Sequence, residues 1–299
     1  MINRLAIIGV GLIGGSLARA ARRAGVCSEI VGGGRDEAQL RRAVELGVID
    51  RYELDIAAAV GDADMVVVAV PLGAMEAVLR RIAGRVRPDA VITDVGSAKG
   101  SVVAAARAAF GEVPPGFVPG HPIAGTEKSG VEASFAELFE SRRVILTPLS
   151  TTSAQALAAV RALWQQAGAE VVEMDVAHHD EVLAATSHLP HVLAYALVDT
   201  LVGMDASEEI FRFAAGGFRD FTRIASSDPA MWRDICIANR AALLAVLERF
   251  RAELSSLTAA IEAADGERIV SVFSRAKAAR DRYMILNSET RNLKPGENE

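Results

Sequence analysis

The spacing of hydrophobic residues changes near residue 175 of this chain. Before that point, short apolar runs such as residues 5–10, 65–70 and 90–94 alternate with longer amphipathic stretches. Residues 65–70 are apolar without a break, which is typical of a strand buried on both faces of a sheet. The alternation of strands and helices predicts an α/β fold with a doubly wound parallel sheet.

The elements that this pattern predicts fall into two groups. In the first group we expect strands at residues 5–10, 29–32, 65–70, 90–94, 117–119, 143–147 and 171–174, and helices at residues 14–24, 37–46, 75–82, 101–109 and 154–166. After residue 175 we expect only helices, at residues 178–186, 192–201, 229–263 and 267–286. We therefore predict a Rossmann-like dinucleotide-binding domain at residues 1–175, an all-α substrate and dimerisation domain at residues 176–286, and a disordered tail at residues 287–299.

The helix predicted at residues 229–263 is unusually long. Asp228 as N-cap and Pro229 at the first helical position mark its start, and it contains no internal Gly or Pro. One domain would hardly bury such a helix, so we expect a homodimer interface along it. A long helix within a monomeric bundle is the alternative.

The composition is that of a globular protein, since 51% of its 299 residues are hydrophobic and 23% are charged. The formal net charge of -6 argues against a general binder of nucleic acid or anionic membrane. The longest apolar run, residues 65–75, is interrupted by Pro71 and is shorter than the roughly 20 residues that span a bilayer. With no signal-peptide pattern, and with Cys27 and Cys236 expected to be reduced thiols, we expect a cytoplasmic protein.

A G-x-G-x-x-G pattern, residues 9–14, follows the first predicted strand and opens a helix, which is the context that gives this pattern meaning. We expect Gly9 to permit a tight turn, Gly11 to let the backbone approach a pyrophosphate, and Gly14 to let helix and strand pack closely. A glycine-rich turn in another Rossmann-like protein, such as one that uses S-adenosylmethionine, is the alternative. The expected cofactor contacts are Gly9, Gly11, Leu12, Ile13, Gly14, Gly34, Arg35, Val70, Pro71 and Ser97.

The end of the second predicted strand bears on the choice of dinucleotide. A carboxylate there binds the adenosine 2′-hydroxyl of NAD, whereas this chain has Gly34 followed by Arg35. A glycine leaves room for a 2′-phosphate and a guanidinium can clamp it, so the sequence favours NADP over NAD. Asp36 would take the NAD role if the register differs by two residues.

Polar residues gather in several segments that flank the predicted strands and helices. His121 and Glu127 lie in a glycine-punctuated loop at residues 120–130, and histidine exchanges a proton near neutral pH. Residues 94–99 follow a strand and end in Lys99, which is one of four lysines in the chain. Lys99 and Lys128 are read equally well as site residues or as surface side chains.

Two histidines, two arginines and a tryptophan in the second half of the chain are further candidate site residues. His188 and His191 are three residues apart and can share a helix face, but no H-E-x-x-H pattern or cysteine cluster supports a metal, so we expect none. They are alternatively ordinary half-buried residues. Arg219 and Arg223 are suited to binding carboxylates, or pair structurally with an Asp. Trp232 is alternatively a packing residue.

Together these segments resemble the prephenate dehydrogenase family, which includes the arogenate and cyclohexadienyl dehydrogenases. The matching segments are GVGLIGGS, DVGSAKG, GHPIAGTEKSGVE, SHLPH and GGFRDFTRIASSDPAMWRD. The resemblance implies an NAD(P)-dependent oxidative decarboxylation in tyrosine biosynthesis, from prephenate to 4-hydroxyphenylpyruvate or from arogenate to tyrosine. It also implies a helical second domain that forms the dimer.

The resemblance further implies roles for individual residues. His121 and Ser97 contact the substrate hydroxyl, and His121 polarises it as hydride leaves, which agrees with its reading as a proton acceptor. Arg223 binds a substrate carboxylate and His191 orients the substrate. The remaining expected substrate contacts are Glu127 as a gate that pairs with Arg223, and Asp220, Trp232 and His188 around the pocket.

Two other functions fit parts of the sequence. A hydroxyacid dehydrogenase would share the Rossmann and helical domains, but it usually needs a catalytic lysine in the helical half, where no lysine has a convincing place. An NAD(P)-binding redox sensor would need the glycine loop but not His121, Ser97 and Arg223 together. The sequence does not choose between prephenate and arogenate.

Overall fold

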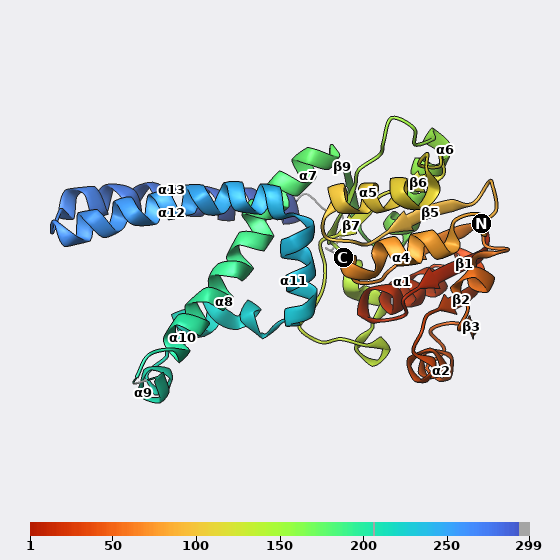
Figure 1. The fold of residues 1–299 in the computed structure, drawn as a ribbon, viewed down its shortest axis with the longest axis horizontal. Helices are drawn as coiled ribbons and strands as arrows, with labels where there is room; N and C mark the ends of the chain where they lie inside the picture. Colours follow the sequence, from red (N-terminus) through yellow and green to blue (C-terminus); the bar gives the residue numbers. More distant parts are fainter. Residues whose placement is uncertain (206, 293–299) are drawn as a thin grey trace. The chain divides into compact units, whose positions relative to one another are not determined.

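The computed structural model describes residues 1–205 and 207–292, and its chain forms two compact units, residues 1–243 and a second unit that begins at Leu244. The first unit opens with a six-stranded sheet in which every neighbouring pair is parallel. In spatial order its strands are β3 (Arg51–Glu53), β2 (Cys27–Gly33), β1 (Ile2–Ile8), β4 (Met65–Val68), β5 (Val91–Asp94) and β6 (Phe117–Val118) (Figure 1). This strand order is that of the Rossmann fold, so the predicted doubly wound sheet is confirmed.

Alternating side chains of the central strands feed two hydrophobic clusters. Leu5 and Ile7 of β1 belong to one cluster, and Ala6 and Ile8 to the other. The helices that contribute to the first are α1 (Leu12–Arg23), α2 (Glu37–Glu45) and α6 (Ala154–Gln166), and those of the second are α3 (Ile56–Val60), α4 (Leu72–Ile82) and α5 (Lys99–Phe110). Successive side chains of a strand point to opposite faces of the sheet, and here both faces are buried. This explains why residues 5–8 of β1 and all of β4 are apolar at every position.

A second, three-stranded sheet corrects one expectation from the sequence. The strands expected at residues 143–147 and 171–174 do not extend the parallel sheet. As β8 (Arg143–Leu146) and β9 (Glu170–Glu173) they form a separate sheet with β7 (Gly120–Pro122), which is antiparallel to β8. Pro119, which has no N–H to donate, separates β6 from β7. The expected loop at residues 120–130 therefore begins as a strand.

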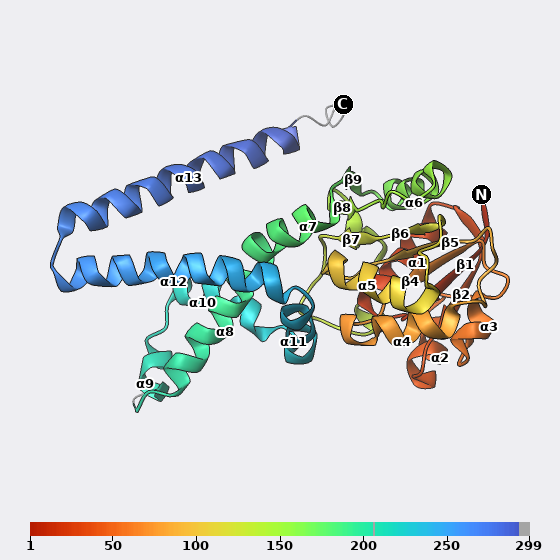
Figure 2. The same cartoon turned by 45° about the horizontal axis from the view of Figure 1, so that its top comes forward.

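The helices that follow run almost without interruption from residue 176 to residue 202 (Figure 2). They are α7 (Val176–Leu183), the π-helical turn η3 (Ala184–His188) and α8 (Leu189–Val202). The sequence predicted two separate helices here, broken around Pro190. The wider π turn lies just before Pro190, which lacks the N–H for a regular helical bond, and π turns of this kind are frequent at functional sites.

The single long helix expected at residues 229–263 is wrong, because it is broken at Asn239. Among the described residues, four short elements lie between α8 and the break: α9 (Ser207–Arg212), α10 (Gly216–Thr222), η4 (Arg223–Ser226) and α11 (Pro229–Ala238). Two further short helices, η1 (Val131–Ala133) and η2 (Ala136–Phe139), stand earlier in the chain, between β7 and β8. Asn239 leaves the helical conformation, and its side-chain amide donates to the Asp180 carbonyl oxygen at 2.8 Å. Helix α12 (Arg240–Glu262) starts directly afterwards.

The second unit consists of the rest of α12 and of α13 (Gly266–Asn292). Helix α13 continues six residues past the predicted end at residue 286, since no Gly or Pro occurs before Pro295. Of the predicted tail, residues 287–292 are therefore helical and residues 293–299 lie outside the described residues. None of the helices in the described ranges has the length and apolar character needed to span a membrane.

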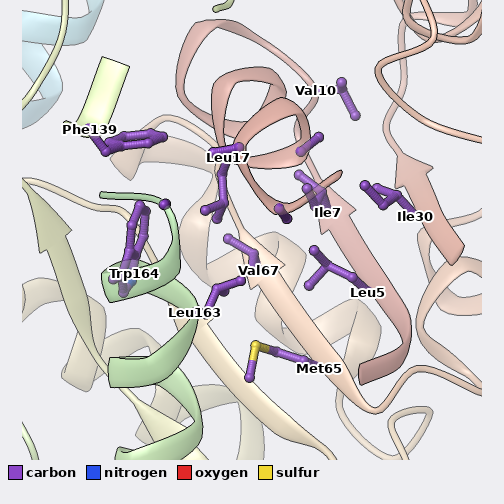
Figure 3. Close-up of a cluster of buried hydrophobic side chains, with 14 of the residues drawn as sticks. Leu5, Ile7, Val10, Leu17, Ile30, Met65, Val67, Phe139, Leu163 and Trp164 are labelled. Carbon is purple, nitrogen blue, oxygen red and sulfur yellow. The ribbon is translucent and has the colours of Figure 1, made fainter. Parts of the chain in front are cut away.

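The core of the first cluster yields a stability prediction. Trp164 of α6 is fully buried and meets the Phe139 ring edge-on, with 5.0 Å between ring centroids (Figure 3). We expect Trp164→Ala to lower the free energy of unfolding by about 3–5 kcal/mol in urea denaturation, because it leaves a large cavity. Trp164→Phe is the control and should cost clearly less, since the indole N–H is buried without a hydrogen-bond partner among the described residues. Equal losses in the two variants would contradict this packing role.

Candidate active site

A buried ion pair fixes the backbone beside His121. The Lys99 ammonium lies 2.5 Å from Asp94 Oδ2 and donates to the Gly120 carbonyl oxygen at 2.5 Å. The Gly120 N–H donates in turn to Asp94 Oδ1 at 3.1 Å. Asp94 ends β5, Lys99 begins α5 and Gly120 begins β7, so three elements meet at this pair.

Lys99 and Asp94 are both completely buried, so the interpretation of Lys99 as a surface side chain is wrong. Burial lowers the pKa of Lys99, and the charge of Asp94 works in the opposite direction. A buried pair of this kind adds little net stability, but loss of one partner leaves an uncompensated charge and costs about 3–5 kcal/mol. Lys128, in contrast, is exposed.

His121 is itself buried, with 8% of its surface exposed, and it contacts a second histidine. Its Nδ1 lies 2.9 Å from Nε2 of His179 in α7. Nδ1 of His179 lies 2.8 Å from Oδ1 of Asp180. The three side chains form one hydrogen-bonded line that begins at the helical segment and ends at β7.

Burial is the main reason why the pKa of His121 lies well below 6.5, and the Lys99 charge and the neighbouring His179 and His188 lower it further. His121 is therefore neutral at physiological pH and able to accept a proton. For Asp180, burial opposes ionisation, but hydrogen bonds from His179, Gly100 and Lys99 outweigh it and lower the pKa. Asp180 is a carboxylate.

His188 lies against the same cluster and has one ring nitrogen available. Its Nδ1 lies 3.1 Å from the Asn239 amide nitrogen, which donates to it. In the neutral ring the hydrogen is then on Nε2, which is buried and has no hydrogen-bond partner among the described residues. Burial lowers the pKa of His188 to about 4, so this ring is a neutral donor.

His191 stacks on Trp232 of α11, with ring centroids 3.6 Å apart and planes at 19°. The ring of His188 meets the same indole edge-on, as the three-residue spacing predicts. Nδ1 of His191 donates to the Ser187 carbonyl oxygen at 2.9 Å, which leaves its Nε2 as an acceptor. Burial lowers the pKa of His191, the hydrogen bond opposes this, and the charge of nearby Arg223 lowers it again.

The structure thus brings together His121, His188, His191, Trp232 and Arg223 from five separate elements. Ser97 lies half-buried in the bend between Asp94 and Lys99. Glu127 and Asp220 are exposed, and within the described part of the chain no ion pair or hydrogen bond joins either to this cluster. The expected pairing of Glu127 with Arg223 is not formed.

A glycine-rich turn, residues 9–14, follows β1 beside the end of β4, at the switch point of the sheet where dinucleotides bind in such folds. Gly9 has a φ of +96°, and a Cβ there would lie 2.3 Å from the Ala69 carbonyl oxygen. A Cβ on Gly11 would meet no atom within 4 Å, so the backbone before α1 faces open space. Leu12 and Ile13 begin α1, which has no side-chain cap and leaves its first N–H groups for a phosphate.

The residues around this glycine-rich turn fit a dinucleotide. A Cβ on Gly14 would come within 2.2 Å of the Gly9 carbonyl oxygen, so only glycine permits the close turn. Val70 and Pro71 connect β4 to α4, and Pro71 stands at the uncapped start of that helix. Gly34 follows β2, Arg35 is exposed, and the Asp36 carboxylate accepts the Gln39 N–H at 3.1 Å as the N-cap of α2.

Sequence reasoning missed His179, Asp180 and Asn239. A signal for the first two was present: the chain has five histidines, and two of them form the run His178-His179-Asp180 where the strands end. Asn239 carried no signal, because it interrupts a helical pattern that nothing else in the sequence breaks.

Two protein-family models match the chain: the nucleotide-binding domain of prephenate dehydrogenase at residues 17–173 and its dimerization domain at residues 175–275. A cyclohexadienyl dehydrogenase of Zymomonas mobilis is 41% identical, over 94% of this chain and 96% of that protein. Prephenate dehydrogenase of Aquifex aeolicus in complex with hydroxyphenyl propionate and NAD+ has a TM-score of 0.87 and 37% identity, over 95% of this chain and 99% of that one. Synechocystis arogenate dehydrogenase has a TM-score of 0.79 and 28% identity, with coverages of 94% and 99%.

The open space at Gly11 is directly testable. We expect Gly11→Ala to weaken dinucleotide binding by about tenfold (about 1.4 kcal/mol), because the added methyl group displaces the phosphate from the backbone. Isothermal titration with NAD+ and NADP+ measures this, and the unfolding midpoint should not change, since the methyl group meets no protein atom. Gly61→Ala, at the end of α3, is the matched control. Unchanged affinity in Gly11→Ala would exclude this glycine-rich turn as the phosphate site.

Proposed function

The chain belongs to the prephenate dehydrogenase family, and we propose that its site oxidatively decarboxylates prephenate, arogenate or both. Prephenate yields 4-hydroxyphenylpyruvate and arogenate yields tyrosine, which places the enzyme in tyrosine biosynthesis. The observation that carries the proposal is His121, a buried imidazole with a pKa well below 6.5, held by the Lys99–Asp94 pair.

The chain's own residues supply the acid–base and binding steps. His121 accepts the proton of the substrate hydroxyl, and Ser97 orients that hydroxyl. A bound nicotinamide would supply the acceptor for the hydride that leaves the ring carbon bearing the hydroxyl. The bond between ring and carboxylate breaks, its electron pair completes the aromatic ring, and CO2 leaves. The proton on His121 then returns to the phenolate oxygen, so the acid–base balance closes.

The remaining polar groups suit a substrate with two carboxylates. Arg223 presents an exposed guanidinium for bidentate binding of one carboxylate. The buried ring of His188 has an Nε2–H that no atom of the described residues accepts. We assign orientation of the substrate to His191 on its Trp232 platform, and we keep Glu127 as a gate and Asp220 as a supporting residue.

We also propose that NADP is the preferred dinucleotide. Gly34 leaves room beside the ribose, the Arg35 guanidinium is exposed, and the Asp36 carboxylate already caps α2. The relative from Aquifex aeolicus was solved with NAD+. The choice in this chain therefore depends on Arg35.

The wider organisation follows the family. We propose a dinucleotide-binding domain at residues 1–175 and a helical domain at residues 176–286 that forms a homodimer. Apolar side chains on α12 and α13, among them Leu254, Ile261 and Phe273, are more than half exposed, as expected of an uncovered subunit interface. Cys27 and Cys236 are free thiols, which supports a cytoplasmic location.

Turnover tests the function directly. We expect NAD(P)H absorbance to rise with prephenate or with arogenate, and His121→Asn to lower kcat by about 10²–10⁴ with little change in dinucleotide affinity. A protein that oxidises neither substrate, or a His121→Asn variant with the wild-type kcat, would contradict the proposal.

The pH dependence of kcat has a defined direction. Only neutral His121 accepts a proton, and its pKa lies below 6.5 because it is buried and close to Lys99. Activity should therefore persist as the pH falls through 6.5 and be lost only at lower pH. A kcat that is already halved at or above pH 6.5 would show that the imidazole is not kept neutral.

Dinucleotide choice has its own test. We expect Arg35→Ala to raise KM for NADP by about tenfold and leave KM for NAD nearly unchanged, because only the 2′-phosphate contacts the guanidinium. Kinetics with each dinucleotide measure this, with Arg41→Ala on the exposed face of α2 as the control. A wild-type enzyme that strongly prefers NAD would overturn the assignment.

A further inference from the structure

The Asp180 carboxylate contacts three hydrogen-bonding groups. Two of them are backbone N–H groups, which can act only as donors. The backbone N–H groups of Lys99 and Gly100 donate to its two oxygens at 2.8 Å each. Both belong to the first turn of α5, where the helix favours a negative charge. Because an ionised carboxylate only accepts, the hydrogen of the 2.8 Å contact with His179 is on Nδ1 of that ring.

The position of this hydrogen determines which nitrogen donates and which accepts in the contact between His179 and His121. Neutral His179 with a hydrogen on Nδ1 has a lone pair on Nε2. The contact of 2.9 Å to His121 is then a hydrogen bond only when His121 carries its hydrogen on Nδ1. The other tautomer of His121 would set two lone pairs against each other at a site where both rings are buried.

We propose that His179 and Asp180 are positioning residues that hold His121 in the tautomer with a free lone pair on Nε2. The proposal rests on the proposed function, in which that lone pair accepts the hydroxyl proton. Lines of this kind, in which a carboxylate orients a histidine through a hydrogen bond, set the tautomer of a catalytic base in other enzymes.

The same line of side chains also stabilises the protonated form of His121 that arises during the reaction. The groups that face His121 from the packed elements are Lys99 of α5, Asp94 of β5, His179 and Asp180 of α7, and His188 of η3. Once His121 is protonated, its Nδ1–H still donates to His179, and the Asp180 carboxylate lies at the far side of that ring. The line thereby offsets the repulsion from Lys99 without releasing a proton of its own.

Substitutions at residue 179 separate positioning from a structural role. We expect His179→Leu to lower kcat by about 10–100-fold with KM and dinucleotide affinity nearly unchanged, since it removes only the acceptor for His121. His179→Gln should recover most of this loss, because an amide accepts from His121 and donates to Asp180. The matched control is His178→Gln, the exposed neighbouring histidine, with wild-type kinetics expected.

Asp180→Asn tests the tautomer itself. An asparagine amide that donates to His179 Nδ1 would reverse both hydrogens in the line and leave His121 with a hydrogen on Nε2. We expect a loss in kcat at least as large as that of His179→Leu. Should this variant fail to fold, because α5 loses an acceptor at its start, the His179 variants decide the question.

The decisive comparison combines His179→Leu with His121→Asn. If His179 acts through His121, the double variant should have the kcat of His121→Asn alone. A wild-type kcat for His179→Leu, or an equal further loss in the His121→Asn background, overturns the inference. An active His121→Asn variant would instead overturn the proposed function, so the two failures are distinguishable.

Discussion

The contact between Lys99 and Asp94 is the constraint on which the site depends. It joins the end of β5, the start of α5 and the strand β7 that carries His121. The side chains of Lys99 and Asp94 are completely buried. A buried ion pair costs desolvation energy that its attraction only roughly offsets. The effect of this ion pair is therefore geometric. Both charges have hydrogen-bond partners only when β5, α5 and β7 meet in one arrangement.

The same pair contributes to the electrostatics around His121. The Lys99 charge is one cause, after burial, of the low pKa of His121. His188 and His191 also have lowered pKa values, and burial is the main cause for both. The histidines are therefore neutral, so that His121 is left to accept a proton and His188 to donate a hydrogen bond. In the proposed function, positive charge for an anionic substrate comes from Arg223.

Local patterns in the sequence predicted a large part of this molecule. Short apolar runs located five of the six strands of the Rossmann sheet, and the glycine spacing located the turn that follows β1. The short strand β3 and the short helix α3 were not predicted. The features that the sequence did not predict at the site depend on partners that are distant in sequence. Lys99 is buried because Asp94 and Gly120 receive its hydrogen bonds, and Asn239 breaks a helix because Asp180 and His188 accept from its amide. The line from Asp180 to His121 likewise joins residues that are about sixty positions apart in the chain and share no local pattern.

The protonation state of His121 is the claim on which the chemistry depends most directly. Nitrogen NMR of the protein labelled only in its five histidines reports the tautomer and charge of each ring. At neutral pH we expect an uncharged His121, with hydrogen on Nδ1 and a lone pair on Nε2. A charged His121, or a hydrogen on Nε2, would contradict it.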